Sequence, residues 1–184
     1  MVSTSLAPLP VDPSRIRPQI QALQAQLVKW RRGLHQKPEL GFREHLTAEF
    51  VSQQLQRWGI EHQTGIAKTG IVAMIRGTRP GPVLAIRADM DALPIQEENQ
   101  VPYKSQHDGL MHACGHDGHV TIALGTACYL AQHREDFAGT VKFIFQPAEE
   151  GPGGAKPMIE AGVLKNPEVD AIIGLHLWNN LPLG

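Results

Sequence analysis

The 184-residue sequence predicts an α/β fold in which a mixed sheet is flanked by helices on both faces. Three observations support this prediction. Two segments with helical periodicity come first in the chain, at residues 14–35 and 43–58. Short and almost wholly apolar runs, typical of strands buried on both faces, come next. A further helical segment at residues 119–133 separates these runs, and such alternation is typical of a sheet covered by helices.

The first part of the chain is predicted to be helical after a short leader. Residues 1–13 are rich in proline, and we expect them to form a flexible leader. In residues 14–35 apolar side chains recur at steps of three and four, which predicts an amphipathic helix capped by Ser14. A second helix is predicted from residue 43 to Trp58, where Gly59 ends it. Both helices are interpreted as packing elements.

Four apolar runs are predicted to be strands. The first two, at residues 71–75 and 83–88, are separated by a connection rich in glycine and proline, which predicts a turn between them. The third run covers residues 140–145 and the fourth covers residues 171–177. A short helix is predicted between them at residues 155–161.

Residues 89–118 show no regular period, and a loop of this length in a compact domain is usually functional. Within and just beyond it, the segment 111–119 provides three imidazoles, a thiol and a carboxylate. Such groups bind metal ions, and Gly115 lets the side chains of Cys114 and His116 approach one ion from a tight turn. The segment is therefore a candidate metal site.

Acidic pairs and a histidine follow three of the predicted strands. Asp89 and Asp91 follow the second strand, Glu149 and Glu150 follow the third, and His176 lies in or just after the fourth. Open α/β sheets form their sites at the carboxyl ends of strands, so these side chains can converge on the candidate metal loop. Two adjacent glutamates repel each other in a dry pocket. The repulsion is relieved if one binds metal and the other holds or releases a proton.

Each of these features has a simpler interpretation when it stands alone. A Cys-Gly-His sequence can form a turn with a buried thiol, paired glutamates are usually solvated, and a histidine between leucines is often a core residue. Their occurrence together, in this order, favours a metal site. Asp117 is interpreted as a residue that orients His116, and His119 as part of the first turn of the next helix. His112 is given no role, and five histidines are expected at the surface or in packing: His35, His45, His62, His107 and His133.

Composition and charge exclude several classes of protein. Seventeen basic and eighteen acidic residues leave a formal charge of −1, which does not favour nucleic acid or an anionic membrane as a partner. No apolar run approaches the roughly 18 residues that a membrane-spanning helix needs. The stretch from Ser3 to Pro13 lacks a basic residue, so a secretory signal is not expected. Two cysteines are too few for a disulfide framework, and we expect a cytoplasmic enzyme.

Four motifs resemble, in the same order, the signatures of the metal-dependent N-acyl-amino-acid amidohydrolases. This group includes aminoacylases, hippurate hydrolases and auxin-conjugate hydrolases, and is related to dinuclear metallopeptidases. The resemblance covers nearly all of residues 16–184. The motifs are RADMDALP at residues 87–94, MHACGHD at 111–117, QPAEEG at 146–151 and GLH at 174–176.

The resemblance implies an incomplete zinc-peptidase-like catalytic domain that binds two divalent ions, most often manganese or zinc. Glu149 would be the general base that activates a metal-bridged water and then protonates the leaving amine. The products would be a carboxylic acid and an amino acid. Asp91 would lie behind the ligands, as Asp117 is also expected to do. The ligands implied are Cys114, at the bridging position, His116, Glu150 and His176.

The resemblance also implies a longer protein. Members of the group carry a lid or dimerisation domain and a C-terminal catalytic segment, so residues 14–184 are expected to be the N-terminal part of the catalytic domain. We expect a small N-acyl amino acid as substrate, neither nucleic acid nor membrane as partner, and a dimer through the lid only in the full-length form. Two alternatives stay open. One is a non-catalytic metal-binding or interaction fragment of such an enzyme, and the other is a redox role for Cys114 and Cys128.

Overall fold

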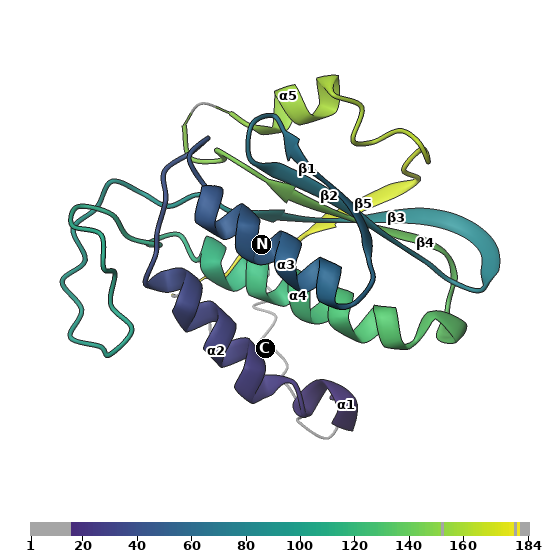
Figure 1. Cartoon of the computed structure of the whole chain (residues 1–184), viewed down its shortest axis with the longest axis horizontal. Coiled ribbons are helices and arrows are strands. Elements are labelled where there is room, and N and C mark those ends of the chain that lie inside the picture. The colour runs from purple at the N-terminus through teal and green to yellow at the C-terminus, as the bar shows by residue number, and fades with distance from the viewer. Residues whose placement is uncertain (1–15, 152, 179, 181–184) are drawn as a thin grey trace, which may run out of the picture.

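The computed structural model describes residues 16–151, 153–178 and 180 and contains a five-stranded mixed sheet with helices packed against it (Figure 1). The predicted leader, residues 1–13, lies outside the described residues. The strands are β1 (Glu61–Ile66), β2 (Gly70–Arg76), β3 (Arg79–Asp89), β4 (Ala138–Gln146) and β5 (Ala171–Gly174). The helices are α1 (Pro18–Gln21), α2 (Gln24–His35), α3 (His45–Arg57), α4 (His116–Gln132), the short 3-10 helix η2 (Arg134–Asp136) and α5 (Ala155–Glu160).

The order of the strands brings the ends of three of them to one edge of the sheet. The order is β1-β2-β4-β3-β5, and β2 pairs antiparallel with both β1 and β4. Strand β3 pairs parallel with both β4 and β5. The carboxyl ends of β3, β4 and β5 therefore point the same way, and the polar residues that follow them lie at a common edge.

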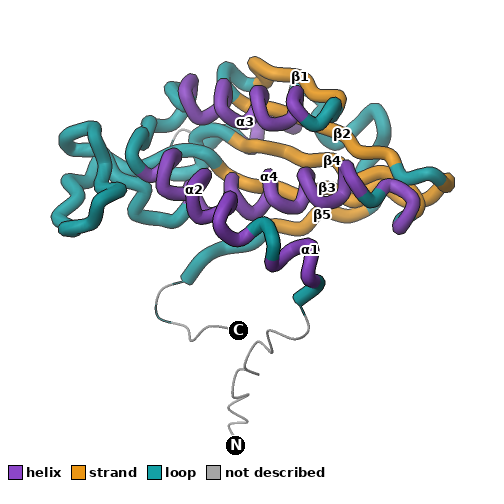
Figure 2. The backbone as a smooth tube through the Cα atoms, turned by 60° about the horizontal axis from the view of Figure 1, so that its bottom comes forward, coloured by secondary structure: helices purple, strands orange, loops and turns teal. Residues whose placement is uncertain are grey.

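Helices lie on both faces of the sheet, which confirms the predicted fold class. Helices α2, α3 and α4 cover one face (Figure 2). The other face carries a smaller apolar cluster, where Met158 of α5 and Val163 pack against Ala85 and Ile144. The larger cluster, under α2 to α4, includes the fully buried side chains of Val51, Leu55, Ile71, Ile75, Leu124, Phe143 and Phe145.

Helix α4 begins three residues earlier than the periodicity predicts. Gly115 precedes it with a φ of 86°, a left-handed conformation that glycine adopts without a steric penalty. The first turn therefore contains His116 and His119, which are three residues apart and so lie on the same side of the helix. The helix is apolar on most sides and is buried along its first three turns. Its first residue therefore cannot be located from amphipathic periodicity.

Other boundaries also differ from the prediction. The segment 14–35 is two helices, α1 and α2, and residues 22–23 separate them. Strand β1 was not predicted, because Glu61–Ile66 is mostly polar and lies at the edge of the sheet. Strands β2 and β3 follow one another along the chain, yet β4 lies between them in the sheet. Strand β5 ends at Gly174, three residues before the predicted end.

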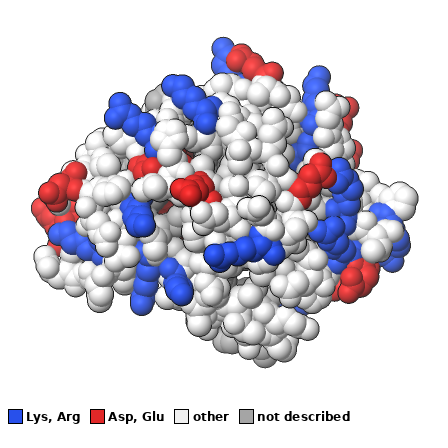
Figure 3. Space-filling view, in the orientation of Figure 1, with Lys and Arg blue, Asp and Glu red and all other residues white. Residues whose placement is uncertain are grey.

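The surface carries mixed charges and one buried lysine lies beneath it. In the view of Figure 3, basic and acidic side chains are scattered over the visible face. Lys142 on β4 is buried, and its ammonium group donates hydrogen bonds to the backbone carbonyls of Val163, Lys165 and Pro167, at 2.8–3.0 Å. Among the described helices, none is long and apolar enough to cross a membrane.

Replacing Leu55 by alanine tests the packing of α3 on the sheet. The side chain is fully buried, so we expect Leu55→Ala to lower the free energy of unfolding by about 2–5 kcal/mol, measured by urea denaturation. Leu46→Ala is the matched control, because Leu46 lies on the same helix and is 45% exposed. Equal losses from the two variants would contradict the described packing.

Candidate metal centre

The edge formed by β3, β4 and β5 meets the first turn of α4, and this junction gathers most of the predicted site residues. Asp89 ends β3, and Asp91 follows it by two residues. The turn after β4 carries Glu149 and Glu150, and His176 follows β5. Cys114 and His116 come from the loop and the first residue of α4. The convergence inferred from the order of the motifs is present in the structure.

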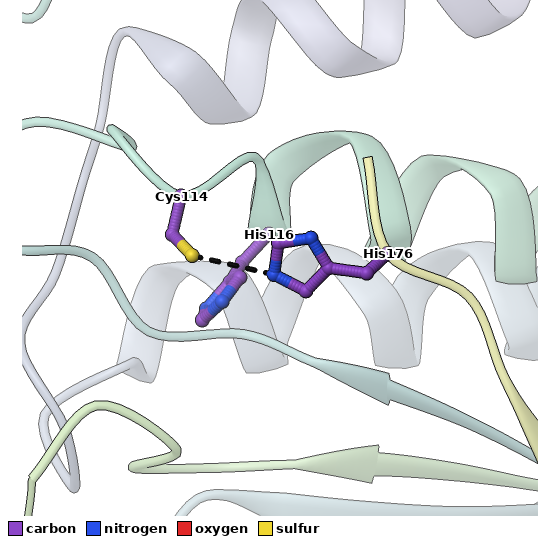
Figure 4. Close-up of side chains that lie close together, drawn as sticks. All are labelled: Cys114, His116 and His176. Atoms are coloured by element: carbon purple, nitrogen blue, oxygen red, sulfur yellow. Dashed lines mark hydrogen bonds between the residues drawn. The ribbon is translucent and has the colours of Figure 1, made fainter. Parts of the chain in front are cut away.

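Cys114, His116 and His176 point toward one another (Figure 4). Their ligand atoms lie within 4.8 Å of one another. The thiol sulfur of Cys114 is 3.4 Å from Nε2 of His176. Nδ1 of His176 lies 2.7 Å from the carbonyl oxygen of Leu177, to which it donates a hydrogen bond, so Nε2 carries the lone pair that faces Cys114. Gly115, in its left-handed conformation, makes the turn between the first two residues.

His116 is surrounded by carboxylates. Its ring is 1% exposed, with Nδ1 3.3 Å from Oδ1 of Asp91 and Nε2 3.7 Å from Oδ1 of Asp89. Nε2 is also 3.7 Å from Oε1 of Glu150 and 3.9 Å from Oε2 of Glu149. Burial by itself lowers the pKa of His116, but Asp91, Asp89 and Glu150 raise it above its ordinary value.

Several buried polar atoms at this junction have no hydrogen-bond partner among the described residues. They are both ring nitrogens of His116, Oδ1 of Asp91 and Oε1 of Glu150. Buried polar groups are almost always paired, so a cluster of unpaired polar atoms needs a specific explanation. Imidazole nitrogen, carboxylate oxygen and a nearby thiol form a donor set that suits a divalent transition-metal ion. The residues present therefore fit a metal.

The thiol of Cys114 is protonated at neutral pH in the absence of metal. Burial, followed by the neighbouring carboxylates Glu150, Glu149 and Asp89, raises its pKa to about 12. A bound cation would reverse this effect, because it stabilises the thiolate.

The turn that carries Glu149 and Glu150 is held by two buried carboxylates. Oδ2 of Asp91 accepts the backbone N–H of Glu150 at 2.9 Å. Oε1 of Glu44, which is fully buried at the start of α3, accepts the N–H of Ala148 at 2.8 Å. Ala148 has a φ of 51°, unusual for a residue with a Cβ atom. Sequence reasoning missed Glu44, since its partner is 104 residues away and no local pattern connects them.

Asp117 does not face His116, and the expectation that it orients this ring is corrected. Oδ2 of Asp117 lies 2.8 Å from Nδ1 of His35 and 2.8 Å from Nε of Arg31. Asp91 is the carboxylate beside Nδ1 of His116. His35 was expected at the surface or in packing, yet it is buried between two carboxylates, with Nε2 3.2 Å from Oε1 of Glu97. The hydrogen bond to Asp117 is the main reason why the pKa of His35 is raised.

His112 lies beside this network and lines a cavity next to the cluster. The cavity has a volume of about 610 Å³, and Cys114 and His176 form part of its wall. His112 is 3% exposed, and neither ring nitrogen has a hydrogen-bond partner among the described residues. Burial lowers its pKa to about 4, so the ring is neutral at neutral pH.

Comparison with known proteins places the chain in a family. Residues 85–184 match the model of peptidase family M20/M25/M40, which confirms the family resemblance of the motifs. An N-acyl-L-amino acid amidohydrolase of Geobacillus stearothermophilus is 49% identical over 166 residues, which are 90% of this chain and 44% of that protein. The N-acetylcysteine deacetylase of Bacillus subtilis is 48% identical over 169 residues, 89% of this chain and 43% of the relative. This chain thus spans less than half the length of these relatives.

A solved structure supports the same fold. The YXEP protein of Bacillus subtilis, described as a dinuclear metal-binding peptidase of the M20 family, superposes with a TM-score of 0.83 at 48% sequence identity. The match covers 88% of this chain and 45% of that one.

Replacing Glu44 by alanine tests the support of the Glu149–Glu150 turn. The change leaves the N–H of Ala148 buried without its acceptor, so we expect the free energy of unfolding to fall by about 1–3 kcal/mol in urea denaturation. Glu49→Ala, at an exposed position of the same helix, should change stability by no more than about 0.5 kcal/mol. A Glu44→Ala protein as stable as this control would show that the contact does not hold the turn.

Proposed function

Because this chain belongs to peptidase family M20/M25/M40, we propose that its protein hydrolyses the amide bond of N-acyl amino acids in a metal-dependent reaction. The products are a carboxylic acid and a free amino acid. Relatives named as an N-acyl-L-amino acid amidohydrolase and an N-acetylcysteine deacetylase support this class of substrate. The observation that carries the proposal is the buried, unpaired set of donor atoms around His116.

We assign the metal ligands to the residues whose donor atoms gather at this junction. Two divalent ions, manganese or zinc, are proposed, because a neighbouring structure is described as dinuclear and because thiol, imidazole and carboxylate donors suit such ions. The proposed ligands are Cys114, His116, Glu150 and His176. When bound, such ions lower the pKa of a coordinated water and polarise the carbonyl of an amide.

Protein side chains supply the remaining chemistry. The carboxylate of Glu149 is 41% exposed, so it can reach a substrate at the mouth of the site. In our proposal it accepts a proton from water at Oε1 or Oε2 and later delivers one to the nitrogen of the leaving amine. Asp91 positions His116 and Glu150, since one of its carboxylate oxygens lies against the ring of His116 and the other accepts the N–H of Glu150.

A second candidate is a metal-binding fragment without catalytic activity. The groups that could hold a metal ion lie within this chain, and binding of an ion does not by itself require hydrolysis. In both interpretations residues 14–184 form the N-terminal part of a catalytic domain.

The proposed setting is cytoplasmic, in keeping with two free cysteines, and a dimer is proposed only for a longer form that carries a lid domain.

Replacing Glu149 by glutamine separates the two candidates. We expect Glu149→Gln to lower the hydrolysis of N-acetyl and N-benzoyl amino acids, with added Mn²⁺ or Zn²⁺, by about 10²–10⁴-fold, because the proton acceptor is lost. Metal binding, measured through the absorption spectrum of bound Co²⁺, should not change. The assay uses the longest product of the gene together with the 184-residue chain, and Glu168→Gln at an exposed position is the control. Absence of turnover in the longest product, with metal bound, would favour the non-catalytic candidate.

Metal uptake should depend steeply on pH. The thiol of Cys114, with a pKa raised to about 12, and the ring of His116, with a raised pKa, hold protons that a metal must displace. We therefore expect affinity for Zn²⁺ or Co²⁺ to rise by about tenfold per pH unit for each displaced proton. A pH indicator in weak buffer should detect the release, and Cys114→Ser should reduce it by about one proton per chain. Affinity that is constant between pH 6 and 8 would contradict the assignment of Cys114.

A further inference from the structure

His119 is a buried histidine that the proposed ligand set leaves out. Its side chain is 2% exposed in the first turn of α4, one turn beyond His116. Its ligand atom lies within 4.8 Å of those of Asp89 and His116, so by distance alone it is a possible metal ligand. The hydrogen bonds of its two ring nitrogens point to another role.

Both ring nitrogens of His119 are engaged by protein groups. Nε2 lies 2.9 Å from the backbone nitrogen of Leu177, which can only donate. Nε2 must therefore carry the lone pair, and the proton is on Nδ1. Nδ1 lies 2.6 Å from Oδ1 of Asp89 and donates to it. The other oxygen of Asp89 accepts from Nη1 of Arg87 at 2.5 Å, which fixes the carboxylate.

This chain of contacts ends on the residue next to His176. The ladder between β3 and β5 stops at Gly174, so the sheet no longer holds His176. Leu177 is instead bound by His119 through its N–H, and its side chain lies against the start of α4. A Cβ atom on Gly118 would approach Cδ1 of Leu177 to 2.4 Å, so glycine at position 118 makes room for this docking. The rings of His119 and His176 are 4.8 Å apart.

We infer that His119 is a positioning residue that holds His176 at the metal centre by accepting the N–H of Leu177, and that it is not itself a ligand. The inference rests on the proposed function in one respect, the assignment of His176 as a ligand. It gives Arg87 and Asp89 a role as well, because they fix the ring whose Nε2 lone pair receives the Leu177 amide.

Two substitutions separate the two nitrogens of the ring. The side-chain amide of His119→Gln reaches the position of Nε2 and can accept the N–H of Leu177. That of His119→Asn reaches only the position of Nδ1 and can still donate to Asp89. We therefore expect hydrogen exchange of the Leu177 amide, in metal-free protein, to be about tenfold faster in His119→Asn than in wild type and to be largely restored in His119→Gln. His45→Asn, at an exposed position of α3, is the control.

Cobalt binding then tests whether the contact acts through His176. Titration with Co²⁺, followed by the thiolate-to-cobalt band from Cys114, should show about tenfold weaker binding in His119→Asn and recovery in His119→Gln. The double variant His119→Asn/His176→Ala should bind no more weakly than His176→Ala alone, because the residue that His119 positions is already gone. The ¹⁵N shifts of the His119 ring should keep the Nδ1–H pattern when cobalt is replaced by Zn²⁺.

The possible failures are distinct. A wild-type chain without a thiolate-to-cobalt band, or a His176→Ala variant with unchanged affinity, would overturn the proposed metal centre, and the Leu177 exchange rates would still decide whether His119 holds this segment. Additive losses in the double variant, or a large Zn²⁺-induced shift of the His119 nitrogens, would identify His119 as a ligand. Unchanged exchange and unchanged affinity in His119→Asn would overturn the inference.

Discussion

Burial of negative charge beside the sheet is the constraint on which the rest of the site depends. Isolated carboxylates are very costly to bury, so each needs a cation or several donors nearby. Asp89 is compensated by Arg87 and His119, and Asp117 by Arg31 and His35. Asp91 lies against the ring of His116 and accepts the backbone N–H of Glu150, but its Oδ1 and Oε1 of Glu150 have no hydrogen-bond partner among the described residues. The compensation is thus complete around the edge of the site and incomplete at its centre, where a divalent ion would supply the missing positive charge.

The site residues that could be predicted from the sequence are those that lie in short motifs or directly after predicted strands. Cys114 and His116 are separated by a glycine that forms a tight turn, and the acidic pairs and His176 directly follow strands. The order of the motifs was therefore enough to predict that these residues lie close together. Glu44 and His35 could not be found in this way. Their partners, Ala148 and Asp117, are 104 and 82 residues away, and only the folded chain pairs them. His119 did carry a signal, since it lies one helical turn from His116, but the predicted helix began too late to reveal it.

The fold shows the same division between local and distant information. Apolar runs identified β2, β3, β4 and β5, because such runs are typical of strands. The run at β5 was predicted three residues too long, and β5 is exposed in the structure. The polar edge strand β1 has no such pattern. No local pattern predicts that β4 lies between β2 and β3, because this position depends on pairing across the sheet and not on neighbours in the chain. Lys142 is another case, because its burial makes sense only once three carbonyls of the segment after α5 surround its ammonium group.

The parallel pairing of β3 also determines when during folding the site can exist. Leu84 of β3 is in register with Val141 of β4 and with Ala171 of β5, so both pairings close long stretches of chain. Closing such loops costs conformational entropy before any contact repays it, and sheets of high contact order fold slowly. His176 follows β5, so we expect it to reach Cys114 only after β5 has paired with β3. The candidate metal centre is therefore expected to be among the last parts of the chain to assemble, so that binding of a metal would report on completion of the sheet.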